Sequence, residues 1–302
     1  LGAIWGASFI FMRVAAPEFG ILPLVVLRTS LATLVFLPFL FLTGGGRQMV
    51  KLWKPMCLLG AINTAVPFAL FNFASLQLQS GVLAILNATA PMFAAMFAFI
   101  WLRERLSKLA IVGLMCGFVG VVVISLDKTL GSQLSIVPVL AVLGAAGCYG
   151  WGACMMKKSL AGVKPVAVAA GSQFWASLLL TPFALLQLPQ AWPSSLAWMN
   201  ALALALVGTG LAYLLYFFLI ASAGPAKAVM VGYLVPLFGI AWGVIFLNEI
   251  LSVWDFCGGL LILLGISFTT GVAQRVAHWA KQRLVVNYLP THQIPAVPAS
   301  LI

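Results

Sequence analysis

Long stretches without any charged side chain constrain this chain more than any other feature. No Asp, Glu, Lys, Arg or His occurs in residues 55–102, 165–226 or 228–248. A helix needs about 20 apolar residues to cross a bilayer, so each of the first two stretches can hold two spans. Only 7% of the residues are charged, against about a quarter in soluble proteins. The composition excludes a soluble globule and predicts an all-α integral membrane protein.

Charges, prolines and polar clusters divide the apolar runs into ten predicted helices. Short connections make neighbouring helices antiparallel, which predicts a bundle. The cysteines fall within apolar runs without metal-site or redox spacing, so we expect small buried side chains and no metal. The predicted helices lie near 1–16, 23–43, 55–74, 81–102, 109–126, 137–156, 166–186, 198–220, 227–247 and 255–273.

The basic residues are distributed unevenly between alternate connections. Thirteen Lys and Arg fall in one set of connections and after the last helix, whereas the other set holds only Lys128. Because Lys and Arg are enriched on the cytoplasmic side, both termini are predicted to be cytoplasmic. Residues 274–302, with His278 and His292, are expected to form a solvated cytoplasmic tail.

Two parts of the sequence resemble each other at a constant spacing of 145 residues. Near the start of the halves a spacing of 144 pairs Arg13 with Lys157. Each half holds five helices, an odd number, so the halves 1–130 and 131–273 are predicted to have opposite orientations. Such halves can open a central site first to one side and then to the other; the alternative is an old duplication kept for folding alone. The residues paired at 145 include Pro91 with Pro236, Glu104 with Glu249, Gly113 with Gly258 and Gly120 with Gly265.

Residues 74–124 and 222–266 resemble the two repeats of the EamA family, in the drug/metabolite transporter superfamily. The resemblance covers about 1–273, and its most specific part is a Pro, then Leu-x-Glu, then spaced glycines, appearing twice. It implies ten helices in two inverted repeats, a bacterial inner membrane location and export of amino acids or related amphipathic compounds. It also implies a central cavity lined mainly by the first, third, fourth, sixth, eighth and ninth helices, and we expect no cofactor.

Polar and aromatic side chains within the predicted spans are the candidates for binding a substrate. An unpaired amide in hydrocarbon costs several kcal/mol, so Asn63 and Asn87 must face partners or water. Trp5 and Met12 share a helix face with Ser8, and aromatic rings with a few polar groups suit an amphipathic solute. Contacts between helices or with lipid are the alternative for each. The candidates are Trp5, Met12, Asn63, Asn87, Tyr149, Tyr213, Tyr233 and Arg28.

Arg13 and Arg28 are the only arginines within or at the edge of a predicted span. A lone guanidinium there is costly unless it is paired, hydrated or able to reach the interface. Attraction of a carboxylate substrate is the sharper hypothesis for Arg28. The alternative is that both side chains extend to the external surface, with Glu18 as a partner.

Two prolines and two glutamates are predicted to have structural roles. Pro91 and Pro236 fall inside the fourth and ninth helices, where each removes a backbone hydrogen bond and kinks the helix. Glu104 and Glu249 come just before Leu-Ser and are predicted to accept hydrogen bonds from the start of the following helix. A proton-carrying role is the alternative. The inverted topology places Glu104 on the cytoplasmic side and Glu249 on the external side.

Three classes of function remain to be compared: a transporter, an intramembrane enzyme, and a non-transporting scaffold or receptor. An enzyme needs a nucleophile with a base, paired carboxylates or metal ligands at membrane depth, and the sequence contains no such group. The expected partners are a small solute and the lipid bilayer, not nucleic acid. The oligomeric state is left open, with a monomer competent in principle. Without a carboxylate at mid-membrane, facilitated diffusion or exchange is predicted, and proton antiport would need Glu104 or Glu249.

Overall fold

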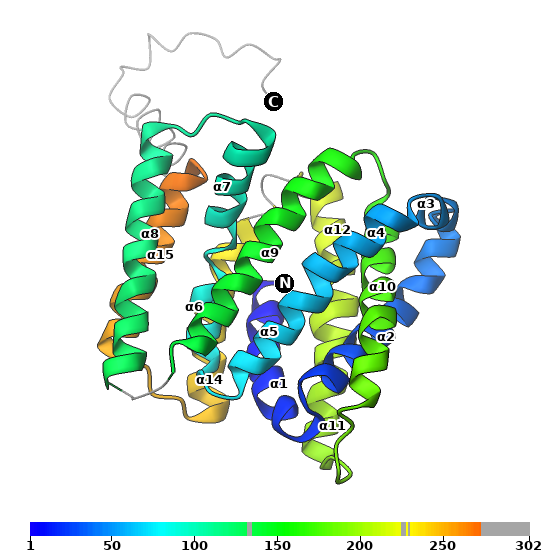
Figure 1. The fold of residues 1–302 in the computed structure, drawn as a ribbon, viewed down its shortest axis with the longest axis horizontal. Coiled ribbons are helices and arrows are strands. Elements are labelled where there is room, and N and C mark those ends of the chain that lie inside the picture. The colour runs from blue at the N-terminus through cyan, green and yellow to red at the C-terminus, as the bar shows by residue number, and fades with distance from the viewer. Residues whose placement is uncertain (132–134, 225–227, 229, 273–302) are drawn as a thin grey trace, which may run out of the picture.

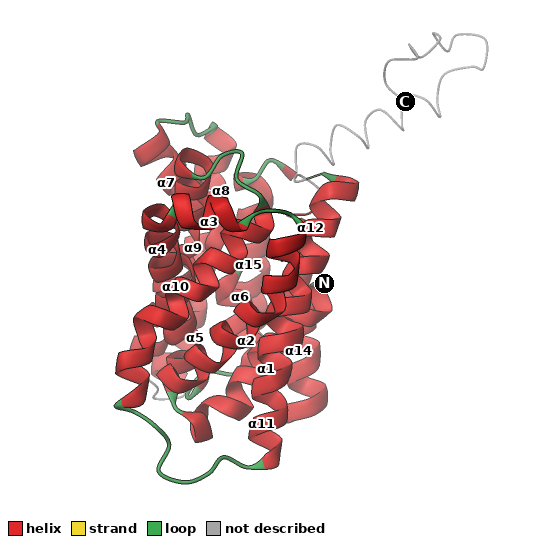
Figure 2. Cartoon of the chain, turned by 90° about the vertical axis from the view of Figure 1, so that its right-hand side faces the viewer, coloured by secondary structure: helices red, strands yellow, loops and turns green. Residues whose placement is uncertain are grey.

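The computed structural model describes residues 1–131, 135–224, 228 and 230–272, and in this part of the chain every regular element is helical. The helices run roughly along one direction, with their connections at the two ends of the bundle (Figure 2). The predicted tail 274–302 and the basic residue Lys227 lie outside the described residues.

The predicted helices correspond to the observed ones, but several are built from more than one segment. Trp53–Ser75 and Ser195–Ala223 each contain a π-helical segment in the middle. The first half comprises α1 (Gly2–Phe19), α2 (Ile21–Leu42), α3 (Gly46–Lys51), α4 (Trp53–Gly60), η1 (Ala61–Ala65), α5 (Val66–Ser75), α6 (Ser80–Asn87), α7 (Ala90–Leu102), α8 (Lys108–Leu126) and η2 (Asp127–Gly131). The second half comprises α9 (Val137–Ser159), α10 (Pro165–Leu185), α11 (Ser195–Leu202), η3 (Ala203–Leu211), α12 (Ala212–Ala223), η4 (Met230–Tyr233), α14 (Leu234–Leu247) and α15 (Val253–Thr269).

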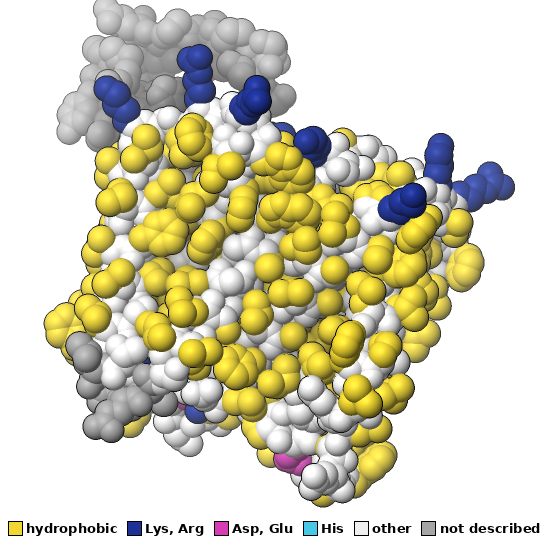
Figure 3. Space-filling model, viewed as in Figure 1, with side chains coloured by type: hydrophobic (Ala, Val, Ile, Leu, Met, Phe, Trp, Pro, Cys, Tyr) yellow, Lys and Arg dark blue, Asp and Glu magenta, His cyan; other side chains and the backbone are white. Residues whose placement is uncertain are grey.

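Eight helices in the described part are long and apolar enough to cross a membrane, and α15 is a shorter apolar helix of 17 residues. The helix α1 is less apolar because it contains Arg13 and Glu18. Large apolar side chains such as Phe41, Ile100 and Leu260 point outward, as expected where lipid rather than water surrounds the protein. They cover the body of the molecule, while Lys and Arg gather at one end (Figure 3).

The helices α8 and α15 are packed with their backbones in contact, at one side of the bundle (Figure 1). A Cβ atom at Gly113 would lie 2.5 Å from the carbonyl oxygen of Gly265, and one at Gly120 would lie 2.5 Å from that of Gly258. Contacts below 3.0 Å are essentially absent from real Cβ atoms, so these positions require glycine. The four glycines are those that the sequence pairs at a spacing of 145.

Pro91 and Pro236 lie in the first turns of helices and not in helix interiors, which differs from the predicted kinks. The helix α6 ends at Asn87, and Pro91 lies in the first turn of α7. Pro236 lies in the first turn of α14, after the 3-10 turn η4. In a first turn the missing N–H of proline has no helical acceptor to lose. In the first half a turn at Ala88 and Thr89 separates α6 from α7, whereas in the second half α14 follows η4 directly.

The ends of α7 and α14 also match. Each ends at a residue in the left-handed region, Arg103 with φ 56° and Asn248 with φ 50°. The next helix in each case is capped by a serine, since Ser107 Oγ accepts from Ala110 N and Ser252 Oγ accepts from Asp255 N. The serines, not the glutamates, cap the following helices.

Candidate functional site

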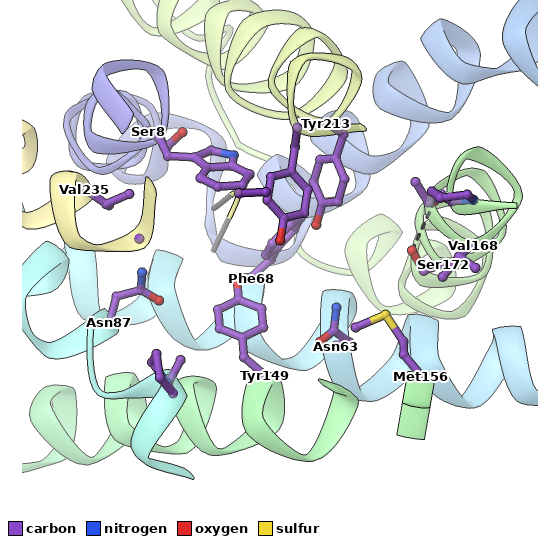
Figure 4. A pocket seen from close by; sticks show the side chains of 18 of the residues that line it. Ser8, Asn63, Phe68, Asn87, Tyr149, Met156, Val168, Ser172, Tyr213 and Val235 are labelled. Atoms are coloured by element: carbon purple, nitrogen blue, oxygen red, sulfur yellow. Dashed lines mark hydrogen bonds between the residues drawn. The ribbon is translucent and has the colours of Figure 1, made fainter. Parts of the chain in front are cut away.

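A cavity of about 660 Å³ lies in the middle of the bundle and is lined by all eight candidate binding residues. Asn63 and Asn87 come from one side of it, with Tyr149, and Ser8 and Tyr213 come from the other (Figure 4). The six helices implied by the family resemblance all contribute. The lining also includes Arg28 from α2, Ser172 from α10 and Ile266 from α15, so the cavity involves more of the bundle than the resemblance implied.

Aromatic rings form most of the wall around the centre of the cavity. The ring of Trp5 lies 5.3 Å from that of Tyr216 and 6.4 Å from that of Tyr213, between centroids. Phe71 is stacked on Tyr149 with 6.1 Å between centroids. Rings at these separations attract one another and give a rigid apolar surface, which suits a flat or apolar solute.

A few polar groups interrupt this surface. The side-chain amide of Asn72 donates to Ile21 O, a contact between helices. The side-chain amides of Asn63 and Asn87 form no hydrogen bond within the described residues, and both line the cavity. The hydroxyl of Tyr233 is paired with that of Thr270 at 2.6 Å. The cavity therefore offers two amides to a solute.

Arg28 is the charged residue of the described lining, and its side chain is buried with 7% exposed. Its Nε donates to Thr209 Oγ1 at 2.8 Å, and its Nη1 lies 3.9 Å from Met12 Sδ. Its Cζ lies 3.7 Å from the centroid of the Phe68 ring. The expected extension to the external surface is therefore incorrect, because the guanidinium turns into the bundle and is stabilised by a hydroxyl and a ring.

Most of the other lining residues were not among the sequence candidates, and three residues around the site matter for its geometry. Phe68 and Tyr216 line the cavity, and Thr209 orients Arg28. Thr209 is a lone hydroxyl in a strongly apolar run, a signal that could have identified it. Nothing in the sequence distinguishes Phe68 from the other 20 phenylalanines, because its role depends on a helix packed against it.

The cavity extends toward one end of the bundle. Its lining reaches Leu160, Val163 and Pro165, in the connection between α9 and α10. Pro165 is exposed, and the same connection carries Lys164. The cavity therefore extends toward the end of the bundle at which most Lys and Arg side chains lie (Figure 3).

At the opposite end, Glu249 and Arg13 join α14 to the first half of the chain. Arg13 Nε lies 3.0 Å from Glu249 Oε1, and its Nη1 donates to Leu78 O at 2.6 Å. The Glu249 carboxylate also accepts from Ser80 N at 2.9 Å and from Ser80 Oγ at 2.7 Å. Glu249 thus accepts hydrogen bonds from a helix N-terminus, as predicted, but from α6 of the other half and not from the helix that follows it.

Glu104 is paired with Lys157 in an exposed ion pair, with 48% of the glutamate and 66% of the lysine side chain exposed. The predicted cap on the following helix is incorrect here, since Ser107 takes that place. This ion pair corresponds to the Arg13–Glu249 pair in the sequence repeat. Lys157 follows Arg13 by 144 residues, and Glu249 follows Glu104 by 145 residues. Pairs that correspond in the repeat therefore lie at the two ends of the bundle, the Arg13–Glu249 pair half-buried and the Lys157–Glu104 pair exposed.

The remaining acidic residues are also engaged away from the cavity. Glu18 accepts from Ser194 N and Ser194 Oγ, not from an arginine. Lys128 Nζ lies 2.7 Å from Asp255 Oδ2 and 3.2 Å from Asp127 Oδ2. Within the described residues no group of three or more His, Cys, Asp or Glu could hold a metal ion.

Comparison with known proteins gives consistent matches along the chain. The model of the EamA-like transporter family matches residues 1–126 and 136–271. The uncharacterized transporter YvbV of Bacillus subtilis is 27% identical, with 76% of each chain covered. The uncharacterized inner membrane transporter YedA of Escherichia coli is 26% identical, covering 89% of this chain and 88% of the relative. The protein PecM of Dickeya dadantii is 29% identical over 67% of this chain and 68% of the relative.

A solved crystal structure of a protein shares the fold, with a TM-score of 0.60 at 18% identity over 90% of this chain and 97% of that one. Family and relatives point to transporters, and the apolar helices make the chain a multi-pass membrane protein. Because the family model covers nearly the whole described chain, the protein belongs to the EamA-like transporter family.

Proposed function

We propose that this protein exports small amphipathic metabolites, such as amino acids or related compounds, by alternating access. The observation that carries the proposal is the central cavity, whose lining reaches the connection between α9 and α10 at one end of the bundle. At the other end the Arg13–Glu249 pair joins α1 to the end of α14 and is not part of that lining. Relatives named as transporters, one of them of an inner membrane, support a transport role in a bacterial inner membrane. The partners are the solute and the bilayer; no nucleic acid, cofactor or catalytic group takes part.

The orientation in this proposal follows from the basic residues. Lys and Arg are enriched on the cytoplasmic side of membrane proteins, so the end with Lys157, Lys158 and Lys164 faces the cytoplasm. Both termini lie on that side. The cavity is then open to the cytoplasm and closed to the outside, as an exporter is when it takes up its solute.

The second state follows from the repeat. Two halves with opposite orientations can exchange conformations, and three observations support such halves here. The contacts Gly113–Gly265 and Gly120–Gly258 exchange with each other under the spacing of 145, the left-handed residues Arg103 and Asn248 correspond, and so do the two ion pairs. In the outward-open state the Lys157–Glu104 pair would become the buried one and the Arg13–Glu249 pair would open.

Energy coupling is inferred from the positions of the carboxylates. None of the five lies among the described lining residues of the cavity, and each is bonded elsewhere. A relay that carries protons with the solute needs an ionisable group at membrane depth. We therefore infer facilitated diffusion or exchange.

Flux from reconstituted vesicles tests the proposed function. Vesicles would be loaded with a panel of labelled amino acids and related small carboxylates and amides, and efflux measured against protein-free vesicles. We expect efflux of at least one amphipathic solute, and only a modest change when a pH gradient is imposed. Strong acceleration by the gradient would reject the uncoupled mechanism, and no efflux across the panel would reject export in favour of a non-transporting scaffold.

A further inference from the structure

Each of the five carboxylates in the sequence has a partner that is not Arg28. Glu249 is bonded to Arg13 and α6, Glu104 to Lys157, Asp127 and Asp255 to Lys128, and Glu18 to Ser194. Arg28 has a hydroxyl, a sulfur and a ring as its contacts. An anion would stabilise this buried guanidinium further by charge-assisted hydrogen bonds, and a solute in the cavity can supply one because Arg28 is part of the lining.

We propose that Arg28 binds the acidic group of the solute, and that the cavity prefers carboxylates of net charge −1 to zwitterions. This inference rests on the proposed function and narrows the class of its substrate. A guanidinium binds a carboxylate by parallel hydrogen bonds. Thr209 holds the Nε end of the Arg28 fork, which leaves Nη donors free for the solute.

The charge of the cavity argues against a zwitterion. An ammonium group on the solute would lie in the same low-dielectric space as Arg28, where like charges repel strongly, and the described lining offers it no carboxylate. A single positive charge also matches one negative charge. A phosphate monoester, with nearly two, would leave an excess of negative charge in the cavity.

The surroundings of Arg28 define the rest of the solute. Phe68 lies against the guanidinium and between Tyr149 and Tyr213 in the view of Figure 4. The rings of Trp5 and Tyr216 continue this surface. The body of the solute is therefore apolar or aromatic, with its acidic group directed to Arg28 and its remaining polar atoms within reach of the Asn63 and Asn87 amides.

Four compounds with one phenyl ring separate these possibilities: phenylpropanoate, phenylalanine, phenylpropanamide and phenyl phosphate. Their binding to the purified full chain in detergent would be measured by calorimetry at neutral pH. We expect phenylpropanoate to bind at least about tenfold more tightly than the other three, since removing one member of a buried charge pair costs this much or more. Equal or tighter binding of phenylalanine would overturn the inference while leaving the proposed export of amino acids intact. Tighter binding of phenyl phosphate would show that Arg28 prefers a phosphate to a carboxylate, which would also overturn it.

Two variants assign the preference to Arg28. Arg28→Gln should abolish the difference between phenylpropanoate and phenylpropanamide, and Arg47→Gln, which removes one exposed positive charge from α3, should leave it unchanged. If Arg28→Gln is poorly folded, the comparison of the four compounds on the unmodified chain still decides. A preference that survives in folded Arg28→Gln protein would overturn the assignment, and failure of every compound to bind would count against the substrate class, which the flux measurement tests separately.

Discussion

The buried charges of this molecule are compensated in different ways at the scale of single residues. Glu249 and Asp255 are at most 8% exposed, and each has a cationic partner. Arg28, equally buried, has none among the carboxylates. Ion pairs in a low dielectric break even only when their remaining hydrogen bonds are satisfied. Glu249 and Asp255 are therefore committed to contacts within the protein, although Asp255 Oδ1 has no hydrogen-bond partner among the described residues, and Arg28 is left without an anionic partner.

Lys128 offers a test of the structural pairs. Replacing it in Lys128→Met leaves Asp127 and the fully buried Asp255 side by side without a cation, and uncompensated buried charge costs about 3–5 kcal/mol. We expect a large fall in thermal stability in detergent, measured by tryptophan fluorescence. The control Glu104→Gln breaks an exposed pair, for which about 0–1 kcal/mol is expected. Equal effects of the two variants would contradict this account.

Glycine decides the contact between α8 and α15 at the scale of elements. Without a hydrophobic driving force between helices in lipid, close backbone approach and van der Waals packing hold them together. The Gly113–Gly265 and Gly120–Gly258 contacts provide that approach. The pair forms one rigid side of the bundle, away from the residues that line most of the cavity.

Gly120→Ala tests this packing. The new Cβ would meet Gly258 O at 2.5 Å and Leu261 Cβ at 2.9 Å, so the helices must separate, at a cost of about 1–3 kcal/mol. Gly46→Ala is the control, because nothing lies within 4 Å of that position, which is the first residue of α3. Gly120→Ala should lower the unfolding temperature and Gly46→Ala should leave it nearly unchanged, and a stabilised Gly120→Ala protein would contradict the packing.

The two ends of the bundle differ at the scale of the whole molecule. One holds a half-buried ion pair to which two segments far apart in the sequence contribute, and the lining of the cavity reaches toward the other. If the halves alternate, weakening one closure shifts the population toward the state in which that end is open. Weakening either ion pair should then change the ratio of the two conformations, in opposite directions for the two ends.

Ser8→Cys in a background without the native cysteines reports on this equilibrium, since Ser8 lines the cavity. A small charged thiol reagent should reach it from the cytoplasmic side of inside-out vesicles and only slowly from the outside. Adding Glu249→Gln removes the charge that pairs with Arg13, so labelling from the outside should rise severalfold, whereas adding Glu104→Gln should not raise it. Fast external labelling without either change would refute the proposed orientation of the open cavity.

The candidate site could be anticipated from the sequence to an unusual extent, because each polar or aromatic group in an apolar span needs a partner. That requirement selected Asn63, Asn87 and Tyr149, and all eight candidates line one cavity. Their binding roles stay predictions. The same rule suggested Glu18 as the partner of Arg28, which was wrong, since Phe68 and Thr209 come from distant segments and only packing brings them within 3.7 Å and 2.8 Å.

Composition and charge placement determined that this chain is a multi-spanning helical membrane protein, because the bilayer leaves few other structures for uncharged runs of that length. The spacing of 145 residues also indicated which glycines correspond. Only the tertiary structure decided that Glu249 binds α6 instead of its own neighbour, and that Pro91 and Pro236 lie in the first turns of α7 and α14. These depend on which segments meet in space, and sequence spacing along one helix carries no information on contacts across the bundle.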